Sequence, residues 1–293
     1  MNGVIIEDTF AEAFGMKATR VIVTAANAEW ARHAGTAATG LATSVIACGC
    51  EAGIERELPP EATPDGRPGV SLLLFAVSTK ELTKQIERRI GQCVLTCPTT
   101  AAYAGLCGGE ALPMGKSLRY FGDGFQISKL IGGRRYWRIP VMDGEFVCEE
   151  TTAMVNAVGG GNILIVAENC EAALAAAEAG IAAMRRIEGV IMPFPGGVVR
   201  SGSKVGSKYK ALPASTNDAY CPALRGRVAS QLGEGEDCVM EIVIDGLSEA
   251  DVAAATAAGI RAACAVPGVR RISAGNYGGK LGPFHFHLRK VLA

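Results

Sequence analysis

The 293-residue sequence has no excess of charge of either sign, because lysine plus arginine and aspartate plus glutamate each number 29. A balanced chain has no general attraction for nucleic acid or for an anionic membrane, so any charge selectivity is expected to be local. No run of 18 apolar residues is present, and the first residues include acids where a secretory signal would carry basic residues. We therefore expect a cytoplasmic protein without a nucleic-acid or membrane partner.

Motifs for metal, nucleotide and covalent chemistry are also missing. The ten cysteines contain no C-x2-C pair, so reduced structural thiols are expected. The only histidines are His33, His285 and His287, and the last two share one strand face without a third ligand. No G-x-S-x-G elbow occurs, and the glycines near Lys116, Lys204 and Lys280 match neither a nucleotide P-loop nor a dinucleotide fingerprint. Direct group transfer without a covalent enzyme intermediate fits this sequence best.

Strand and helix patterns alternate along the chain, of which 49% is apolar. The N-terminal half reads as strand, helix, strand at 20–26, 27–40 and 44–48, and again at 70–77, from Ser78 onward and at 93–96. The C-terminal half repeats this order at 162–167, 170–186 and 189–194, and again at 238–247, from Ser248 onward and at 269–275. Between 115 and 148, a Gly132-Gly133 pair separates two β-rich runs, as in a hairpin.

The repeated βαββαβ order predicts an α+β fold of two ferredoxin-like α/β sandwich lobes with antiparallel sheets. We expect an N-terminal lobe with a hairpin extension at residues 1–148, and a C-terminal lobe at 149–293 with an insertion at 195–236. A doubly wound parallel sheet in one larger domain is the alternative, since the order of the strands within a sheet cannot be read from the pattern.

The segment PFPGGVVRSGSKVGSKYK, residues 193–210, is the densest cluster of glycine and basic residues. Glycines let backbone N–H groups approach a ligand closely, while cations form charge-assisted bonds to carboxylates or phosphates. An ordinary solvated loop is the alternative. We predict an anion-binding loop whose contributing residues are Arg200, Ser203, Lys204, Lys208 and Lys210.

Glu241 interrupts an apolar strand and has apolar neighbours on both sides. If both faces of that strand are covered, the pKa of Glu241 rises and the carboxyl becomes an acid or base near neutral pH. If one face is solvated, the glutamate has no such role. Thr99 and Thr100 offer hydroxyl and backbone donors to an oxyanion.

Six segments in order, NGVIIEDTFAEAF, ATGLATSVIACGCEAGIER, TPDGRPGV, RRIGQCVLTCPTTA, PFPGGVVRSGSKVGSKYK and ISAGNYGGKLG, resemble the formylmethanofuran:tetrahydromethanopterin N-formyltransferase family. They span residues 2–282. The resemblance implies reversible formyl transfer between formylmethanofuran, or a methylofuran relative, and tetrahydromethanopterin. It also implies a homotetramer with no permanently bound cofactor and active sites in clefts between subunits. The family's acid/base glutamate falls on Glu241, and Asn276 and Tyr277 join the expected substrate-binding residues.

Two other functions remain open from the sequence. Paired ferredoxin-like lobes also serve as ligand sensors, which need the basic loop but not Glu241. The second open function is a non-catalytic assembly role in a formyl-carrier hydrolase complex. The resemblance implies such a complex for bacterial members of the family. The balanced charge, and a basic loop that lacks one residue of the archaeal form, suit such a bacterial member.

Overall fold

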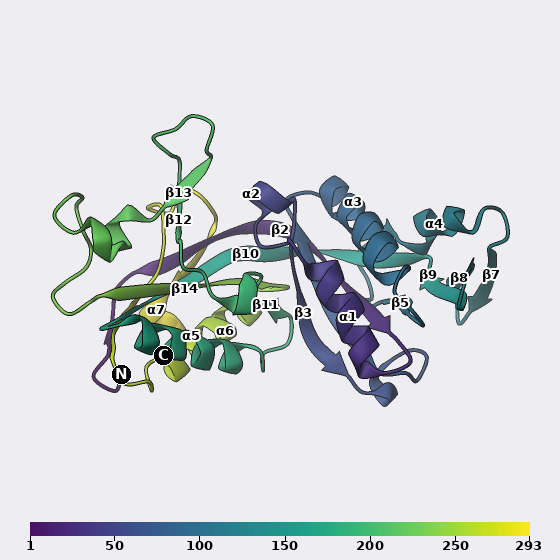
Figure 1. Cartoon of the computed structure of the whole chain (residues 1–293), viewed down its shortest axis with the longest axis horizontal. Helices are drawn as coiled ribbons and strands as arrows, with labels where there is room; N and C mark the ends of the chain where they lie inside the picture. Colours follow the sequence, from purple (N-terminus) through teal and green to yellow (C-terminus); the bar gives the residue numbers. More distant parts are fainter. The chain divides into compact units, whose positions relative to one another are not determined.

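The computed structural model in Figure 1 describes residues 1–293, apart from the side chains of Ser203 and Val205. The chain divides into two compact units: Met1–Gly15 with Val158–Ala293, here the C-terminal unit, and Met16–Ala157, here the N-terminal unit. This division differs from the expected boundary at 148/149. The first 15 residues belong to the C-terminal unit, where the start of the second strand pairs with a strand at residues 284–287.

The N-terminal unit is built on four antiparallel strands in the spatial order β5-β2-β4-β3. Helices α1 and α3 cover one face of these strands, and three further strands form the hairpin extension (Figure 1). The elements are β2 Phe10–Thr24, α1 Ala28–Thr39, α2 Val45–Cys48, β3 Glu51–Leu58, β4 Gly69–Ala76, α3 Thr79–Arg89, β5 Ala101–Ala104, β6 Glu110–Pro113, α4 Gly115–Leu118, β7 Ile127–Ile131, β8 Arg134–Val141 and β9 Gly144–Glu149.

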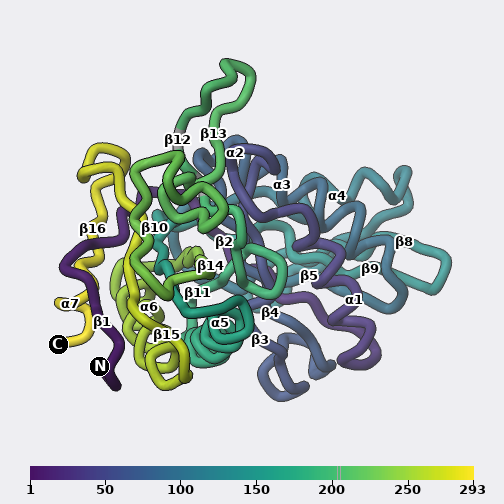
Figure 2. The backbone as a smooth tube through the Cα atoms, turned by 60° about the vertical axis from the view of Figure 1, so that its left-hand side comes forward, coloured from purple at the N-terminus to yellow at the C-terminus, as the bar shows by residue number. Residues whose placement is uncertain are grey.

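The C-terminal unit has a matching antiparallel order, β15-β10-β14-β11. Helices α5 and α6 cover one face, and the segment with β12 and β13 lies on the side of β14 away from α5 (Figures 1 and 2). The elements are β1 Ile5–Ile6, β10 Thr151–Ala167, α5 Cys170–Met184, β11 Val190–Ile191, β12 Ser203–Val205, β13 Ala214–Thr216, β14 Cys238–Gly246, α6 Glu249–Ala263, β15 Val269–Ser273, β16 Phe284–His287 and α7 Leu288–Val291.

The molecule is thus a mixed α/β protein with a large, mostly antiparallel sheet, and the doubly wound parallel alternative is wrong. Helix starts follow the predicted caps: the Ser78 hydroxyl accepts from the Glu81 N–H, and the Ser248 hydroxyl from the Asp251 N–H. The hairpin at Gly132-Gly133 is confirmed, since it joins the antiparallel strands β7 and β8.

Two predicted strands are wrong. Residues 45–48 form the short helix α2, because the Ser44 hydroxyl caps it and Gly49, with φ 76°, ends it in the left-handed region. Residues 90–94 form a π-helical turn that continues α3, so Cys93 to Thr96 is not a strand. Short apolar runs fit a buried helical turn as well as a strand, and here the true strands, β3 and β5, begin a few residues later.

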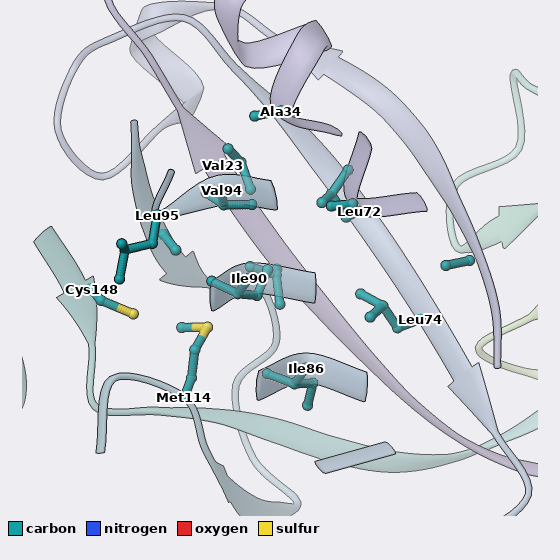
Figure 3. Packing of buried hydrophobic residues seen from close by; sticks show 14 of the residues in the cluster. Val23, Ala34, Leu72, Leu74, Ile86, Ile90, Val94, Leu95, Met114 and Cys148 are labelled. Atoms are coloured by element: carbon teal, nitrogen blue, oxygen red, sulfur yellow. The ribbon is translucent and has the colours of Figure 1, made fainter. Parts of the chain in front are cut away.

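Each unit has its own apolar core. In the N-terminal unit, side chains from α3 and the π-helical turn meet β4, including Leu72, Leu74, Ile86 and Ile90 (Figure 3). Burial of each such side chain stabilises the fold by about 1.5–3 kcal/mol. In the C-terminal unit, the Ala-rich helices α5 and α6 approach closely, and a Cβ added at Gly180 would lie 3.4 Å from the Gly259 carbonyl oxygen. Of the helices in the described part of the chain, none combines the length and apolarity needed to cross a membrane.

Candidate active site around Glu241

Glu241 lies in the middle of β14, with hydrogen-bonded backbone on both edges. On one edge it faces Leu164 of β10, and on the other its N–H donates to the Val199 carbonyl at 2.9 Å and its carbonyl accepts from the Val199 N–H at 2.8 Å. The next residue, Ile242, points into the helix-covered core and is 0% exposed. Glu241 therefore points to the opposite face, which the 195–236 insertion covers, and it is only 8% exposed.

Burial raises the pKa of Glu241 from its ordinary value of 4.5 to about 7, and no other cause contributes. Among the side chains that the structure describes, none hydrogen-bonds to this carboxyl or pairs with it. An isolated carboxyl in a poorly hydrated site favours its neutral form. Near neutral pH, Glu241 populates both protonation states, as a general acid or base requires.

The pocket at Glu241 is small, with a volume of about 30 Å³. It has room for a few atoms near the carboxyl but not for a whole carrier molecule. Gly202 forms part of its wall with a φ of 55°, and a Cβ there would lie 3.6 Å from Glu241 Oε2. The wall comes mainly from the insertion: Leu164, Val199, Arg200, Ser201, Gly202, Asn217, Tyr220, Cys221 and Val239.

The predicted basic loop is only partly assembled around this pocket. Arg200 lines it. The Lys204 ammonium instead forms an ion pair at 2.8 Å with the Asp218 carboxylate, in which both side chains are partly exposed. Lys208 and Lys210 are exposed in the connection between β12 and β13. The Ser203 side chain lies outside the described part of the structure.

The segment with Asn276 and Tyr277 is organised by a residue that the sequence analysis missed, Glu12 of β2. This carboxylate accepts backbone N–H bonds from Tyr277 at 2.6 Å, Gly279 at 3.1 Å, Gly282 at 2.8 Å, and from Leu281. Burial alone would raise the pKa of Glu12, but the four N–H bonds outweigh burial and lower it. Like Glu241, Glu12 is an acid with apolar neighbours inside a strand, so the same sequence signal marks it.

Asn276 has its own contacts within this segment. Its side-chain amide donates to the Thr9 hydroxyl at 3.1 Å and to the Phe10 carbonyl at 3.2 Å. The Asn276 side chain therefore fixes the position of the segment against the start of β2.

Thr99 and Thr100 lie in the N-terminal unit, and their polar groups already have partners. The Thr100 hydroxyl donates to the Val94 carbonyl at 2.6 Å, and the Thr99 N–H donates to Asp143 Oδ2 at 2.6 Å. Thr99 has a φ of 65°, which is rare for a β-branched residue. These contacts hold the end of the π-helical turn in place, and an oxyanion would have to displace them.

A larger, mostly apolar pocket of about 720 Å³ also belongs to the N-terminal unit, lined by Leu95, Thr96, Cys97, Pro98, Phe121, Pro140, Val141, Met142 and Asp143. The pKa of the Cys97 thiol there is raised by burial and by Asp143, which makes it a poorer nucleophile. The smaller pocket is the better candidate for chemistry, because it contains a carboxyl whose pKa is raised to about 7.

His285 and His287 pack around Phe10, with ring centroids 4.8 and 5.2 Å from its ring. Their position on one face of β16 is as predicted. Within the described residues, no group of three or more His, Cys, Asp or Glu side chains is arranged to hold a metal ion.

Fold and pocket together define an α/β protein whose candidate site is a small pocket around one desolvated carboxyl. The family model described as formylmethanofuran-tetrahydromethanopterin formyltransferase matches residues 1–141, and the model described as FTR, proximal lobe, matches residues 144–291. The chain belongs to the formylmethanofuran-tetrahydromethanopterin formyltransferase family, as its sequence motifs indicated.

Relatives match over the full length of the chain. A protein from Methylococcus capsulatus named formylmethanofuran–tetrahydromethanopterin formyltransferase is 71% identical, with 100% of this chain and 99% of the relative covered. A chain of the formyltransferase/hydrolase complex from Methylorubrum extorquens, solved with methylofuran, is 51% identical with a TM-score of 0.98, covering 100% of this chain and 98% of that chain. The formylmethanofuran:tetrahydromethanopterin formyltransferase from Methanosarcina barkeri has 47% identity and a TM-score of 0.95, covering 99% of each chain.

Proposed function

We propose that this protein is a formyltransferase that moves a formyl group reversibly between formylmethanofuran, or a methylofuran analogue, and tetrahydromethanopterin. The observation that carries the chemistry is the Glu241 carboxyl, buried in a small pocket with a pKa of about 7. The names of full-length relatives at 71% and 51% identity support this choice of carriers. The carriers are substrates, and no permanently bound cofactor is part of the proposal.

The proposed mechanism is direct transfer from one amine to the other. A ring nitrogen of tetrahydromethanopterin attacks the formyl carbon, and the new C–N bond gives a tetrahedral oxyanion. The intermediate collapses, the C–N bond to the furan carrier's amine breaks, and that amine leaves with a proton. Protonated Glu241 stabilises the oxyanion or supplies this proton, and it regains one from the attacking nitrogen. Such proton transfer accelerates a reaction by roughly 100- to 10,000-fold.

We propose that the anionic parts of the carriers bind along the basic segment. Arg200 lines the Glu241 pocket, and Lys204, Lys208 and Lys210 follow it in the same insertion. Ser203, Asn276, Tyr277, Thr99 and Thr100 complete the proposed binding set. Charge-assisted hydrogen bonds of this kind are sensitive to salt where the cations are exposed.

We further propose two ferredoxin-like lobes, corresponding to residues 1–148 and 149–293 apart from the exchanged segments 1–15 and 149–157. The spatial orders β5-β2-β4-β3 and β15-β10-β14-β11 support this, because both are the order 4-1-3-2 of a split βαβ pair with antiparallel strands. The proposed working form is a cytoplasmic homotetramer, alone or in complex with hydrolase subunits.

The test is an assay of the purified protein with formylmethanofuran and tetrahydromethanopterin, following formation of the formyl pterin. Wild type is compared with Glu241→Gln and with Glu178→Gln, an exposed glutamate on α5 that serves as the matched control. We expect Glu241→Gln to lose activity by at least 100-fold and the control to match wild type. Full activity in Glu241→Gln would refute the acid/base role of Glu241 but not the proposed formyl transfer.

The second candidate function is a non-catalytic role in ligand binding or assembly within a formyl-carrier hydrolase complex. One observation favours it: a full-length relative from Methylorubrum extorquens, 51% identical, is named as one of the subunits of a formyltransferase/hydrolase complex. In that case the purified chain alone forms no formyl pterin. Activity of the isolated chain decides between the two functions.

A further inference from the structure

A buried polar cluster lies beside Glu241 on the same face of the sheet. Leu164 of β10 is paired with Glu241 on one side and with Ser273 of β15 on the other. Directly paired residues share a face, and so do residues two apart in a strand. Glu241, Ser273 and Arg271 therefore all face the insertion, and Arg271 is only 8% exposed.

Arg271 binds the end of the insertion through its guanidinium. Its Nε and Nη2 donate to the two carboxylate oxygens of Glu236 at 2.7 and 2.9 Å. Nη2 also donates to the Gln231 carbonyl, and Nη1 donates to Glu7 near the N-terminus. A bidentate arginine–carboxylate pair is both strong and directional. The cluster therefore fixes the last residues of the insertion to β15.

A short hydrogen-bonded path leads from this cluster to the wall of the Glu241 pocket. The Gln231 N–H donates to the Ala219 carbonyl at 2.8 Å, one residue before Tyr220. The Tyr220 hydroxyl lies 3.3 Å from the Ser273 hydroxyl, which in turn donates to Glu7. Tyr220 lines the pocket. The pocket wall is thus fastened at its far side by contacts that converge on Arg271.

The groups around Glu241 identify what this fastening does. The titratable side chains facing it are Arg200, Tyr220 and Cys221, all from the insertion, while β10 contributes only Leu164. Burial is the sole cause of the raised pKa of Glu241. The insertion therefore acts on Glu241 by excluding water from its carboxyl.

We infer that Arg271 is a positioning residue for formyl transfer: its bonds to Glu236 and Gln231 hold the insertion against the sheet and keep water from the Glu241 carboxyl. This inference rests on the proposed acid/base role of Glu241. Loosening the insertion admits water, which solvates the carboxylate better than the neutral acid. Glu241 then titrates at lower pH, and a smaller fraction of it carries a proton to donate at neutral pH.

The test uses Arg271→Gln, with Arg270→Gln as the matched control on the same strand. Arg270 pairs with Glu168 at 2.9 Å, but both side chains are about half exposed and lie away from the pocket. The first readout is the titration of Glu241, measured as the carboxyl infrared signal lost in the matching Glu241→Gln variant. The second is the pH profile of kcat for formyl transfer. The first readout needs no activity, so it separates this inference from the proposed function.

In Arg271→Gln we expect the Glu241 midpoint to fall by at least one pH unit and kcat at pH 7 to fall about 5-fold or more, with KM less affected. Arg270→Gln should behave as wild type. An Arg271→Gln protein with an unchanged Glu241 midpoint and kcat profile would overturn the inference. A wild type without a titration near pH 7 would overturn both this inference and the acid/base role.

Arg271→Gln leaves the carboxylate of Glu236 without its partner and is the variant at risk of misfolding. The double variant Arg271→Gln/Glu236→Gln removes one charge of each sign. If Arg271→Gln misfolds, the double variant tests the inference instead, by the same Glu241 midpoint and kcat criteria. Tyr220→Phe gives a third, milder variant, because it removes only the hydroxyl contact to Ser273. In Tyr220→Phe the Glu241 midpoint should fall by less than in Arg271→Gln. An equal or larger fall would mean that Tyr220, and not Arg271, is the residue that keeps water from Glu241.

Discussion

Replacement of Glu241 by glutamine should make the stability of the protein depend on pH in a specific way. Burial raises the pKa of Glu241 to about 7, so the folded chain holds this proton more tightly than the unfolded chain does. Below pH 4.5 both states are protonated, and burial of the acid carries no charge penalty. As pH rises from 4.5 to 7, the unfolded chain ionises first, and the wild type progressively loses stability.

The magnitude follows from the two pKa values. Each unit of difference in pKa corresponds to about 1.36 kcal/mol, so a rise from 4.5 to about 7 costs the wild type about 3 kcal/mol of stability. This cost is fully present above pH 7. Glutamine has nearly the same shape and does not ionise. Between pH 4.5 and pH 8.5, the unfolding free energy of Glu241→Gln should therefore rise by about 3 kcal/mol relative to wild type.

Urea unfolding of both proteins at several pH values from 5 to 8.5 measures this difference. Glu178→Gln, the same substitution at an exposed glutamate of α5, serves as the control. A Glu241→Gln difference that is flat across this range would refute the reasoning, since it would mean that Glu241 is solvated or paired in the folded protein. If the stability advantage of Glu241→Gln over wild type grew as the pH fell, the sign would be opposite to the expected one, and the reasoning would be refuted equally.

Three further substitutions test the surroundings of the site. In Gly202→Ala, a side chain at φ 55° adds about 1 kcal/mol of strain and narrows the pocket, so kcat/KM should fall; an unchanged kcat/KM would contradict the proposed pocket. Glu12→Gln weakens four N–H bonds and should lower the unfolding free energy by roughly 3 kcal/mol in urea. Because the pKa of Glu12 is lowered, this loss should shrink as pH falls below 4.5, and a constant loss would argue against a charged carboxylate. Lys204→Ala removes an exposed ion pair with Asp218 and should change stability by less than about 1 kcal/mol, but it should raise KM for the anionic carrier and weaken the salt dependence of KM.

Local sequence patterns predicted those features that depend on neighbours along the chain. Ser78 and Ser248 mark helix starts because each hydroxyl meets an N–H three residues on. Gly132-Gly133 marks a hairpin because both positions need a left-handed backbone conformation. The doubled βαββαβ order followed from the same local periods. The predicted strands at residues 44–48 and 93–96 were wrong. At the first, the cap at Ser44 and the left-handed Gly49 bound a short helix, and at the second the chain continues α3 in a π-helical turn.

The candidate site shows the same division. An acid between apolar neighbours identified Glu241 as a candidate, and the resemblance to a family increased its weight. Neither the local pattern nor the resemblance determined whether the second face of the Glu241 strand is shielded from water. The answer came from Val199, which pairs with Glu241 across 42 positions of sequence, and from an insertion fastened by Arg271.

By itself, the sequence determined the identity of the family, the helix starts, the hairpin and a short set of acids and cations that can do chemistry. Only the tertiary structure decided which strands are neighbours, that Glu12 organises the segment after β15, and that Glu241 is desolvated. The physical reason is that desolvation is a property of everything packed around a group. At Glu241 that packing joins β10, β14 and the insertion, which are far apart in the chain and meet only in the fold.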